Sequence, residues 1–325
     1  MNLKSDGNLK INEPLAVELI IDHLQKLVKK QNTKGILLGL SGGIDSAILT
    51  TLAVKALGKE KVKVCFVFDR DSEDSSKINA EKMARWLGLE LEMTDMSLVM
   101  RKKRVYSPLI MKAVPYSARF NRMIQHFYRF AVRENPFKTT LKVGANRMEK
   151  SLLKQFMFNL SIRHIDQGFS ERHRYRRQLL EQKAADENLT LIGAANRSEF
   201  EVGWFVKEGI DDLPNQPMTG LYKTQIWQLA AYLNLPEEIQ NQTPSPDMMR
   251  GIRDEFAIGY NYRKLDQMLD FIERKTSDPE IVDKGYDIHE IKDIRELMML
   301  SAWKRASEHE PPPVHGGING NVRLL

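Results

Sequence analysis

One stretch decides the fold of this chain: Leu38-Gly39-Leu40-Ser41-Gly42-Gly43-Ile44-Asp45-Ser46-Ala47. The residues that lead into it, 35–40, form an apolar run with the length of a buried parallel strand. Residues 47–54, which follow it, have the apolar spacing of a helix. A glycine turn at this junction lets backbone N–H groups at the start of the helix approach an anion. The stretch therefore predicts a strand, a phosphate-binding loop and a helix, in this order.

The residue types in the loop indicate a nucleotide pyrophosphate site. Gly42 and Gly43 permit close approach of the backbone, while Ser41 and Ser46 supply hydroxyl donors. Asp45 would repel a phosphate unless it holds a cation, so we interpret it as a magnesium ligand. The loop is not a Walker loop, because no lysine follows its glycines.

Strand and helix signals alternate along the rest of the chain. Further strands are expected at 62–68, 89–94 and 189–193, and helices at 14–30, 46–57, 78–87 and 178–188. This alternation predicts an α/β fold, a Rossmann-like doubly wound parallel sheet with flanking helices. Ligands of such sheets bind at the carboxyl ends of the strands.

Composition narrows the class of protein. The chain has 325 residues and a formal charge of +6, and residues 101–177 hold about 19 Lys and Arg against 4 Asp and Glu. We expect a single domain over 1–325 with a basic helical insertion at about 100–167 and a C-terminal tail at about 306–325. No apolar run is long enough to cross a bilayer, so a soluble cytoplasmic protein is expected, with no membrane partner.

The cysteine count bears on the source of nitrogen. Cys65 is the only cysteine and lies in the apolar run 62–68, which is typical of a core residue. A cysteine-dependent glutaminase would need an exposed thiol elsewhere. If the reaction consumes ammonia, the ammonia is therefore expected to be free or supplied by a partner.

A second motif, Gly193-Ala194-Ala195-Asn196-Arg197-Ser198-Glu199, follows the last predicted strand. Because parallel strands end at one edge of the sheet, Glu199 is expected close to Asp45. Two carboxylates beside a triphosphate give Mg²⁺ the oxygen ligands that it prefers. Taken alone, the motif is more typical of a helix cap than of a metal site.

The ordered set of motifs resembles a known family. Ser-Gly-Gly-x-Asp-Ser is similar to the signature of the ATP pyrophosphatase superfamily, whose members cleave ATP between the α and β phosphates. Residues 193–199 are followed by Leu221-Tyr222-Lys223, then by Pro244-Ser245-Pro246-Asp247 and Asp254-Glu255. In this order they resemble the ammonia-dependent NAD synthetases, over roughly 15–99 and 168–305.

The resemblance implies roles for individual residues. Catalytic roles fall to Asp45, Glu199 and Lys223, of which Asp45 and Glu199 would bind Mg²⁺. ATP would be bound by Ser41, Gly42, Gly43, Asp45, Ser46, Arg174, Arg176, Lys223 and Ser245, although a neighbouring register would choose Arg172. The acceptor would be bound by Asn196, Lys207, Asp211, Asp212 and Lys304.

The activity implied is adenylation of the carboxylate of deamido-NAD by ATP, followed by attack of ammonia to give NAD, AMP and pyrophosphate. The cofactors implied are ATP and Mg²⁺, and the family resemblance implies a homodimer. Positioning and electrostatic stabilisation of the leaving pyrophosphate would supply the acceleration.

The chain also departs from the family pattern. Gly-Thr becomes Gly193-Ala194, two expected aspartates fall on Ile210 and Pro214, and an expected histidine is Trp303. Asp211 and Asp212 are candidates to replace the missing acids. These changes leave open a divergent ligase acting on another carboxylate. A catalytically silent relative is a further alternative, against which the intact Asp45, Glu199 and Lys223 argue. The basic segment leaves open an RNA-binding tRNA-modifying enzyme, but it has no recognised RNA-binding motif, so nucleic acid is not the partner we expect.

Overall fold

The fold is built on a four-stranded parallel sheet. The computed structural model describes residues 9–113, 118–148, 151–247, 251–306 and 312. The strand order is β3-β2-β1-β4, and every neighbouring pair is parallel. The strands are β1 (Ile36–Gly39), β2 (Val62–Phe68), β3 (Leu91–Asp95) and β4 (Thr190–Ile192). The predicted fold class and all four predicted strands are confirmed, and the bounds of β2 coincide with the prediction.

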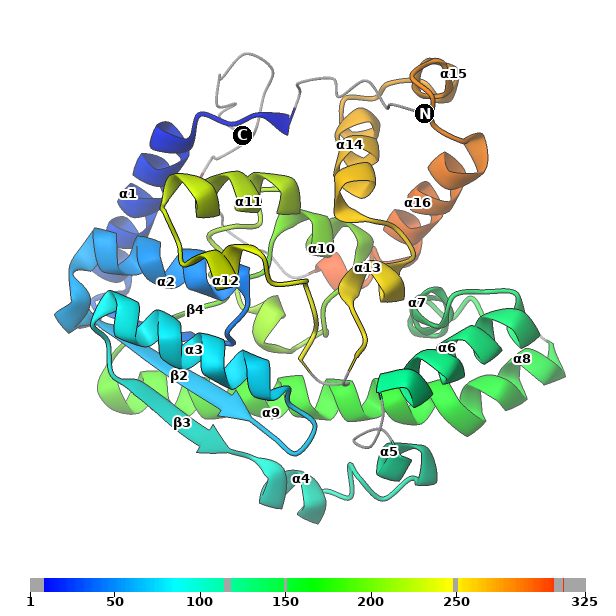
Figure 1. Cartoon of the computed structure of the whole chain (residues 1–325), viewed down its shortest axis with the longest axis horizontal. Coiled ribbons are helices and arrows are strands. Elements are labelled where there is room, and N and C mark those ends of the chain that lie inside the picture. Colours follow the sequence, from blue (N-terminus) through cyan, green and yellow to red (C-terminus); the bar gives the residue numbers. More distant parts are fainter. Residues whose placement is uncertain (1–8, 114–117, 149–150, 248–250, 307–311, 313–325) are drawn as a thin grey trace.

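Helices cover one face of the sheet (Figure 1). Alternate residues of the strands, such as Ile36, Leu38 and Val64, join a core with the apolar sides of these helices because side chains of a strand alternate between faces. The helices are α1 (Glu13–Gln31), α2 (Ile44–Leu57), α3 (Asp74–Leu87), α11 (Lys223–Tyr232) and α12 (Glu237–Gln240).

The opposite face packs mainly against one long helix, and Met96, Met100 and Tyr106 complete this core. Leu37, Cys65 and Val67 point to this side and contact Leu180 and Ala184. Both of the latter belong to α9 (Arg163–Glu187), whose C-terminal part is the predicted helix 178–188. The helix starts earlier than predicted because it continues from a π-helical turn, Phe158–Ile162, which sequence periodicity does not reveal.

Short helices fill the segment between β3 and α9. They are α4 (Ser97–Lys102), α5 (Leu109–Ala113), α6 (Ala118–Val132), α7 (Pro136–Gly144) and α8 (Leu152–Met157). Pro136 occupies the first turn of α7, where its missing N–H costs no hydrogen bond, and Asn135 caps the helix.

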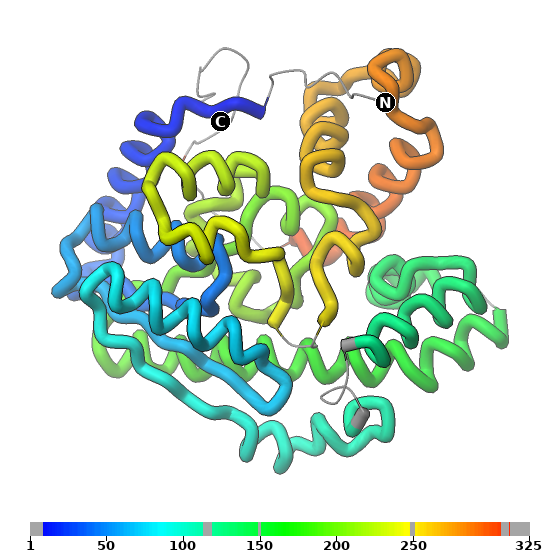
Figure 2. Tube along the Cα trace, in the orientation of Figure 1, coloured from blue at the N-terminus to red at the C-terminus, as the bar shows by residue number. Residues whose placement is uncertain are grey.

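The remaining helices form a second apolar core. They are α10 (Arg197–Val202), α13 (Asp254–Ile258), α14 (Tyr262–Glu273), α15 (Asp278–Asp283) and α16 (Ile288–Leu300). Figure 2 traces α14–α16 and the helices α6–α8 on the same side of the molecule. Lys138 of α7 forms ion pairs with Asp293 and Glu296 of α16, at 2.5 and 2.6 Å, which join the two groups.

Two further expectations concern membrane-spanning segments and the C-terminal tail. Within the described residues, no helix is both long enough and apolar enough to span a membrane. Most of the expected C-terminal tail at 306–325 lies outside the described residues.

Candidate active site

The loop between β1 and α2 is folded around its own hydroxyl groups. The Ser41 and Ser46 Oγ atoms lie 3.0 Å apart, and Ser46 Oγ donates to the Gly43 carbonyl at 3.0 Å. The Ser41 N–H donates to Ser46 Oγ at 3.2 Å, and the Gly43 N–H to Ser41 Oγ at 3.3 Å. These contacts place the start of α2 and two hydroxyls at the carboxyl edge of the sheet, where an anion is stabilised.

Gly42 is required for this turn. Its φ is +81°, and a Cβ at this position would lie 2.1 Å from the carbonyl oxygen of Ser76 in α3. Only glycine accommodates both the positive φ and the close approach of α3.

Three charged residues from distant parts of the sequence meet next to this loop. Lys223 Nζ pairs with Asp45 Oδ2 and lies 3.4 Å from Glu199 Oε1. Asn196 caps α10 by accepting from the Glu199 N–H at 3.1 Å, and its Nδ2 donates to Asp45 Oδ1 at 2.9 Å. The structure therefore brings together the loop, the Asn196–Glu199 motif and Lys223.

Burial and mutual repulsion control the ionisation of this group. Burial raises the pKa of Glu199 to about 8; Lys223 opposes the rise, while Asp45 and Asp254 add to it. Burial also raises the pKa of Asp254, against the effect of Lys223. Burial by itself lowers the pKa of Lys223, but Asp45 and Glu199 outweigh this effect and raise it above its usual value.

This charge balance fits a divalent cation. Asp45, Glu199 and Asp254 surround the ammonium of Lys223, so the cluster carries excess negative charge when all three carboxyls are ionised, the state that a bound cation stabilises. Within the described part of the chain, no three His, Cys, Asp or Glu side chains form a ready-made metal site. Mg²⁺ binds through one or two carboxylates completed by substrate phosphates, and the carboxylates present are of that kind.

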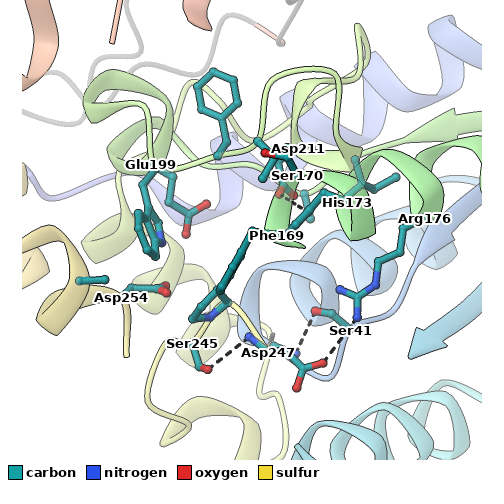
Figure 3. A pocket seen from close by; sticks show the side chains of 18 of the residues that line it. Ser41, Phe169, Ser170, His173, Arg176, Glu199, Asp211, Ser245, Asp247 and Asp254 are labelled. Atoms are coloured by element: carbon teal, nitrogen blue, oxygen red, sulfur yellow. Dashed lines mark hydrogen bonds and ion pairs between the residues drawn. The ribbon is translucent and has the colours of Figure 1, made fainter. Parts of the chain in front are cut away.

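A cavity of about 680 Å³ opens beside the cluster. Its size lies within the range of ligand-binding pockets. Figure 3 shows Phe169, His173 and Arg176 of α9 projecting into it, opposite Glu199, Asp254 and Ser245. The residues expected to bind ligands that line the cavity are Ser41, Gly43, Asp45, Ser46, Arg174, Arg176, Glu199, Lys207, Asp211, Lys223, Ser245 and Lys304.

The other expected site residues, Gly42, Asn196 and Asp212, lie outside the described cavity lining. Asn196 and Asp212 are buried. Asn196 is attached to Asp45, as described above. Asp212 Oδ2 accepts from the Glu208 N–H at 2.8 Å and pairs with Lys207 Nζ at 3.4 Å, so it holds the loop together.

Three arginines of α9 were candidates to bind ATP, and they lie in two environments. Arg174 Nε lies 3.4 Å from Glu208 Oε2, and Arg176 lies 4.0 Å from Asp247; both arginines face the cavity. Arg172 is fully buried, and its Nη1 lies 3.4 and 3.2 Å from Asp69 and Asp71. Arg174 and Arg176 therefore face the cavity, whereas Arg172 is held in the core by two aspartates.

Ser245 lies in the segment that faces α9 across the cavity. Its Oγ donates to the Ile252 carbonyl at 3.2 Å and accepts from the Asp247 N–H at 3.3 Å. Asp247 Oδ1 in turn accepts from Ser76 Oγ at 2.7 Å and from the Glu73 N–H at 2.9 Å. These bonds connect the segment to the first turn of α3.

One wall of the cavity, the α7 wall, consists of Phe137, Gly144, Trp303 and Lys304. The indole of Trp303 packs so closely that a Cβ on Gly144 would lie 2.1 Å from Trp303 Cζ2. Lys304 Nζ donates to the carbonyls of Gly203 and Phe205, at 3.0 and 2.5 Å, and burial lowers its pKa to about 8.

Sequence reasoning did not assign roles to several residues of the cavity. From the sequence, Asp254 is recognisable only as part of a motif, and no role is predicted for Phe169 or His173, although all three residues line the cavity. His173 Nδ1 lies 3.4 Å from Asp211 Oδ2, and burial, together with Arg176 and Arg172, lowers the pKa of His173 well below its usual value. Their spacing on α9 from Arg176, by seven and three residues, was the available signal.

The arrangement suits nucleotide chemistry at the carboxyl edge of the sheet. A glycine loop at a helix start, a buried lysine and converging carboxylates can hold a magnesium triphosphate. The basic and aromatic walls beside them leave room for a second substrate.

Comparisons with known proteins agree with this geometry. The family model described as NAD synthase matches residues 16–134 and 149–308, which is most of the chain. Among curated relatives, the NH(3)-dependent NAD(+) synthetase of Methanosarcina mazei is 30% identical over 302 residues, covering 91% of this chain and 95% of the relative. That of Coprothermobacter proteolyticus is 32% identical over 246 residues, with coverages of 76% and 80%.

Solved structures share the fold. The NMN synthetase of Francisella tularensis superimposes with a TM-score of 0.65 at 19% identity, covering 93% of this chain and 99% of that one. The NH3-dependent NAD synthetase of Campylobacter jejuni gives 0.58 at 23% identity, with coverages of 91% and 96%. From the extent of the family match and the identity to its curated members, this chain belongs to the NAD synthase family.

Proposed function

We propose that the protein is an ammonia-dependent NAD⁺ synthetase, a ligase that forms a C–N bond. ATP adenylates the carboxylate of deamido-NAD with release of pyrophosphate, and ammonia then displaces AMP to give the amide of NAD. The family match and the NH(3)-dependent relatives support this reaction. The observation that carries it is the meeting of Asp45, Glu199 and Lys223 beside the phosphate loop.

The residues of the chain act mainly by positioning and by charge. The start of α2 and the hydroxyls of Ser41 and Ser46 would bind the phosphates of ATP. Lys223 lies beside them and would place positive charge on the departing pyrophosphate. The cavity would hold the carboxylate of the acceptor in line with the α phosphate while excluding water.

Magnesium and the acceptor contacts are part of the proposal. Asp45 and Glu199 would hold Mg²⁺, which supplies Lewis-acid stabilisation of phosphate charge when bound. Arg174, Arg176 and Ser245 would contact ATP. We assign the acceptor to Lys207, Asp211 and Lys304, with Asn196 and Asp212 supporting the site from behind.

We also propose that the chain folds as one synthetase domain with a helical insertion, and that two such chains form a homodimer. Exposed apolar side chains on α6 and around α8 support this, because subunit interfaces bury surfaces of this kind. They are Met123, Phe127, Phe130, Leu152, Leu153, Phe156 and Leu160. Light scattering measures the subunit number, and a monomer at working concentration would contradict the proposal. Location in the cytoplasm stays a prediction.

The function is tested by AMP release from ATP with magnesium and ammonium. Deamido-NAD is compared with no acceptor, with nicotinate mononucleotide and with other carboxylates. AMP formed in step with NAD is the expected result. AMP formed only with another acid would reject deamido-NAD as the acceptor and retain the adenylation chemistry.

A further inference from the structure

A buried tyrosine lies behind the carboxylate cluster. Tyr262 is the first residue of α14 and is fully buried. Its hydroxyl lies 3.2 Å from Asp254 Oδ2 and 3.4 Å from Glu199 Oε1. One phenol group therefore touches two carboxylates that come from different helices, α13 and α10. Both of these carboxylates line the cavity.

The position of Tyr262 is fixed by its surroundings. The ring packs edge-on against Trp227, with centroids 6.2 Å apart, and Lys223 Nζ lies 5.4 Å from its centre. These contacts restrict the ring, so the hydroxyl oxygen has a defined place between the two carboxylates.

One turn further along α14, Asp266 ties the same helix to the helices that carry the charged residues. Its Oδ1 accepts from Ser198 Oγ at 2.5 Å, next to Glu199 in sequence. Its Oδ2 accepts from the N–H and the Oγ1 of Thr224, at 2.8 and 2.7 Å, next to Lys223. The Ser198 hydroxyl also accepts from the Lys223 N–H at 2.8 Å. α14 thus holds the starts of α10 and α11, the helices that carry Glu199 and Lys223, in fixed positions.

A neighbouring tyrosine shows what an ordinary structural role looks like. Tyr260 donates to one carboxylate, Asp293 of α16, at 2.7 Å, and it does not line the described cavity. Tyr262 differs because both of its carboxylate partners face the site of chemistry. The single phenol proton lies between the two carboxylates and offsets their mutual repulsion.

We propose that Tyr262 is a positioning residue of the synthetase reaction, which holds Glu199 and Asp254 together so that both carboxylates face the magnesium and triphosphate. The proposal rests on the proposed function, because it assumes magnesium and ATP at this cluster. It extends that function by making Asp254 a working member of the site. A support of this kind acts through the orientation of ligands and not by touching the substrate.

The test compares Tyr262→Phe with Tyr260→Phe, since each variant removes one carboxylate-bound hydroxyl and keeps the ring. Mn²⁺ binding is measured by electron paramagnetic resonance in the presence of a non-hydrolysable ATP analogue. We expect Tyr262→Phe to weaken Mn²⁺ affinity by about 10–100-fold, and to raise by a similar factor the Mg²⁺ needed for half-maximal AMP release. Tyr260→Phe should leave both quantities unchanged.

A second variant keeps the proposal testable if Tyr262→Phe folds poorly. Asp254→Asn preserves the shape of the side chain and an acceptor for the phenol, and should weaken Mn²⁺ binding in the same way. Where the double variant can be purified, the two losses should be non-additive, because Asp254 is one of the two carboxylates through which the tyrosine acts. Unchanged Mn²⁺ affinity in folded Tyr262→Phe, or in Asp254→Asn, overturns the proposal.

The test of Tyr262 can be separated from the test of the proposed function. Mn²⁺ and analogue binding do not involve the acceptor, so a wild-type protein that fails to amidate deamido-NAD can still show or lack the Tyr262 effect. The acceptor assay judges the function, and the metal titration judges the role of Tyr262.

Discussion

Replacement of Gly144 by alanine should damage the α7 wall in a way that a second change repairs. The new Cβ would lie 2.1 Å from Trp303 Cζ2 and 2.6 Å from Cε2, far inside contact distance. Overpacking of this kind costs about 1–3 kcal/mol. Alanine recovers about 0.5–1 kcal/mol at a helical position, so Gly144→Ala should destabilise the protein by about 1 kcal/mol, and by no more than about 2.5 kcal/mol.

The change should also reach catalysis, because Trp303 and Lys304 line the cavity. Displacement of the indole by the new methyl group should raise KM for deamido-NAD. If the strain weakens acceptor binding by about 1 kcal/mol, KM for deamido-NAD rises about fivefold. KM for ATP should stay unchanged, since the phosphate loop is held by its own hydroxyls and packs on α3 at Gly42.

The assay is a double-mutant cycle with Trp303→Phe, a smaller ring that leaves room for the methyl group. Urea unfolding is followed by circular dichroism, and steady-state kinetics are measured for both substrates. Trp303→Phe should restore most of the stability lost in Gly144→Ala, giving a coupling energy of about 1 kcal/mol or more. Strictly additive effects, or a loss in ATP binding alone, would refute the reasoning.

Other regions of the structure make further predictions. Asp45→Ala and Glu199→Ala should abolish AMP formation and retain the native circular dichroism spectrum, because each removes a proposed magnesium ligand; full activity in either would remove that assignment. Arg172→Met should cost about 3–5 kcal/mol in urea unfolding, because it leaves the buried Asp69 carboxylate without its arginine, while Asp71 keeps Arg70; a loss below about 1 kcal/mol would show that Asp69 is not held as a charge. Burial lowers the pKa of Lys304 to about 8, below the ordinary 10.5, so between these values the unfolded chain binds the extra proton. Stability should therefore rise with pH across this window relative to Lys304→Met, and parallel melting curves would contradict the shift.

Local patterns in the sequence predicted the sheet and the phosphate loop. The strands are short apolar runs, and the turn at Gly42 follows from its residue types. The meeting of Asp45 and Glu199 also followed, because parallel strands end at one edge. The prediction that Lys223 belongs to the site depended on the family resemblance, because the residues around Lys223 do not indicate where the start of α11 lies in the fold.

The remaining part of the site depends on helix packing between distant segments. Asp254 and Tyr262 meet Glu199 only when α13 and α14 dock on α10, and no local pattern encodes that docking. The contact of Trp303 with Gly144 requires α7 to fold against the end of the chain. The early start of α9 was missed because its first turns are polar and follow a π-helical turn.

α9 has a consequence for how such proteins can diverge or be engineered. Its 25 residues form a rod about 37 Å long that Leu180 and Ala184 fasten to the sheet. Phe169 and Arg176 therefore keep their places whatever the length of the connection that precedes the rod. A chimera joined at the π-helical turn Phe158–Ile162 would therefore keep these α9 residues in place, but its replacement segment would have to supply its own α7, which lines the cavity and pairs with α16.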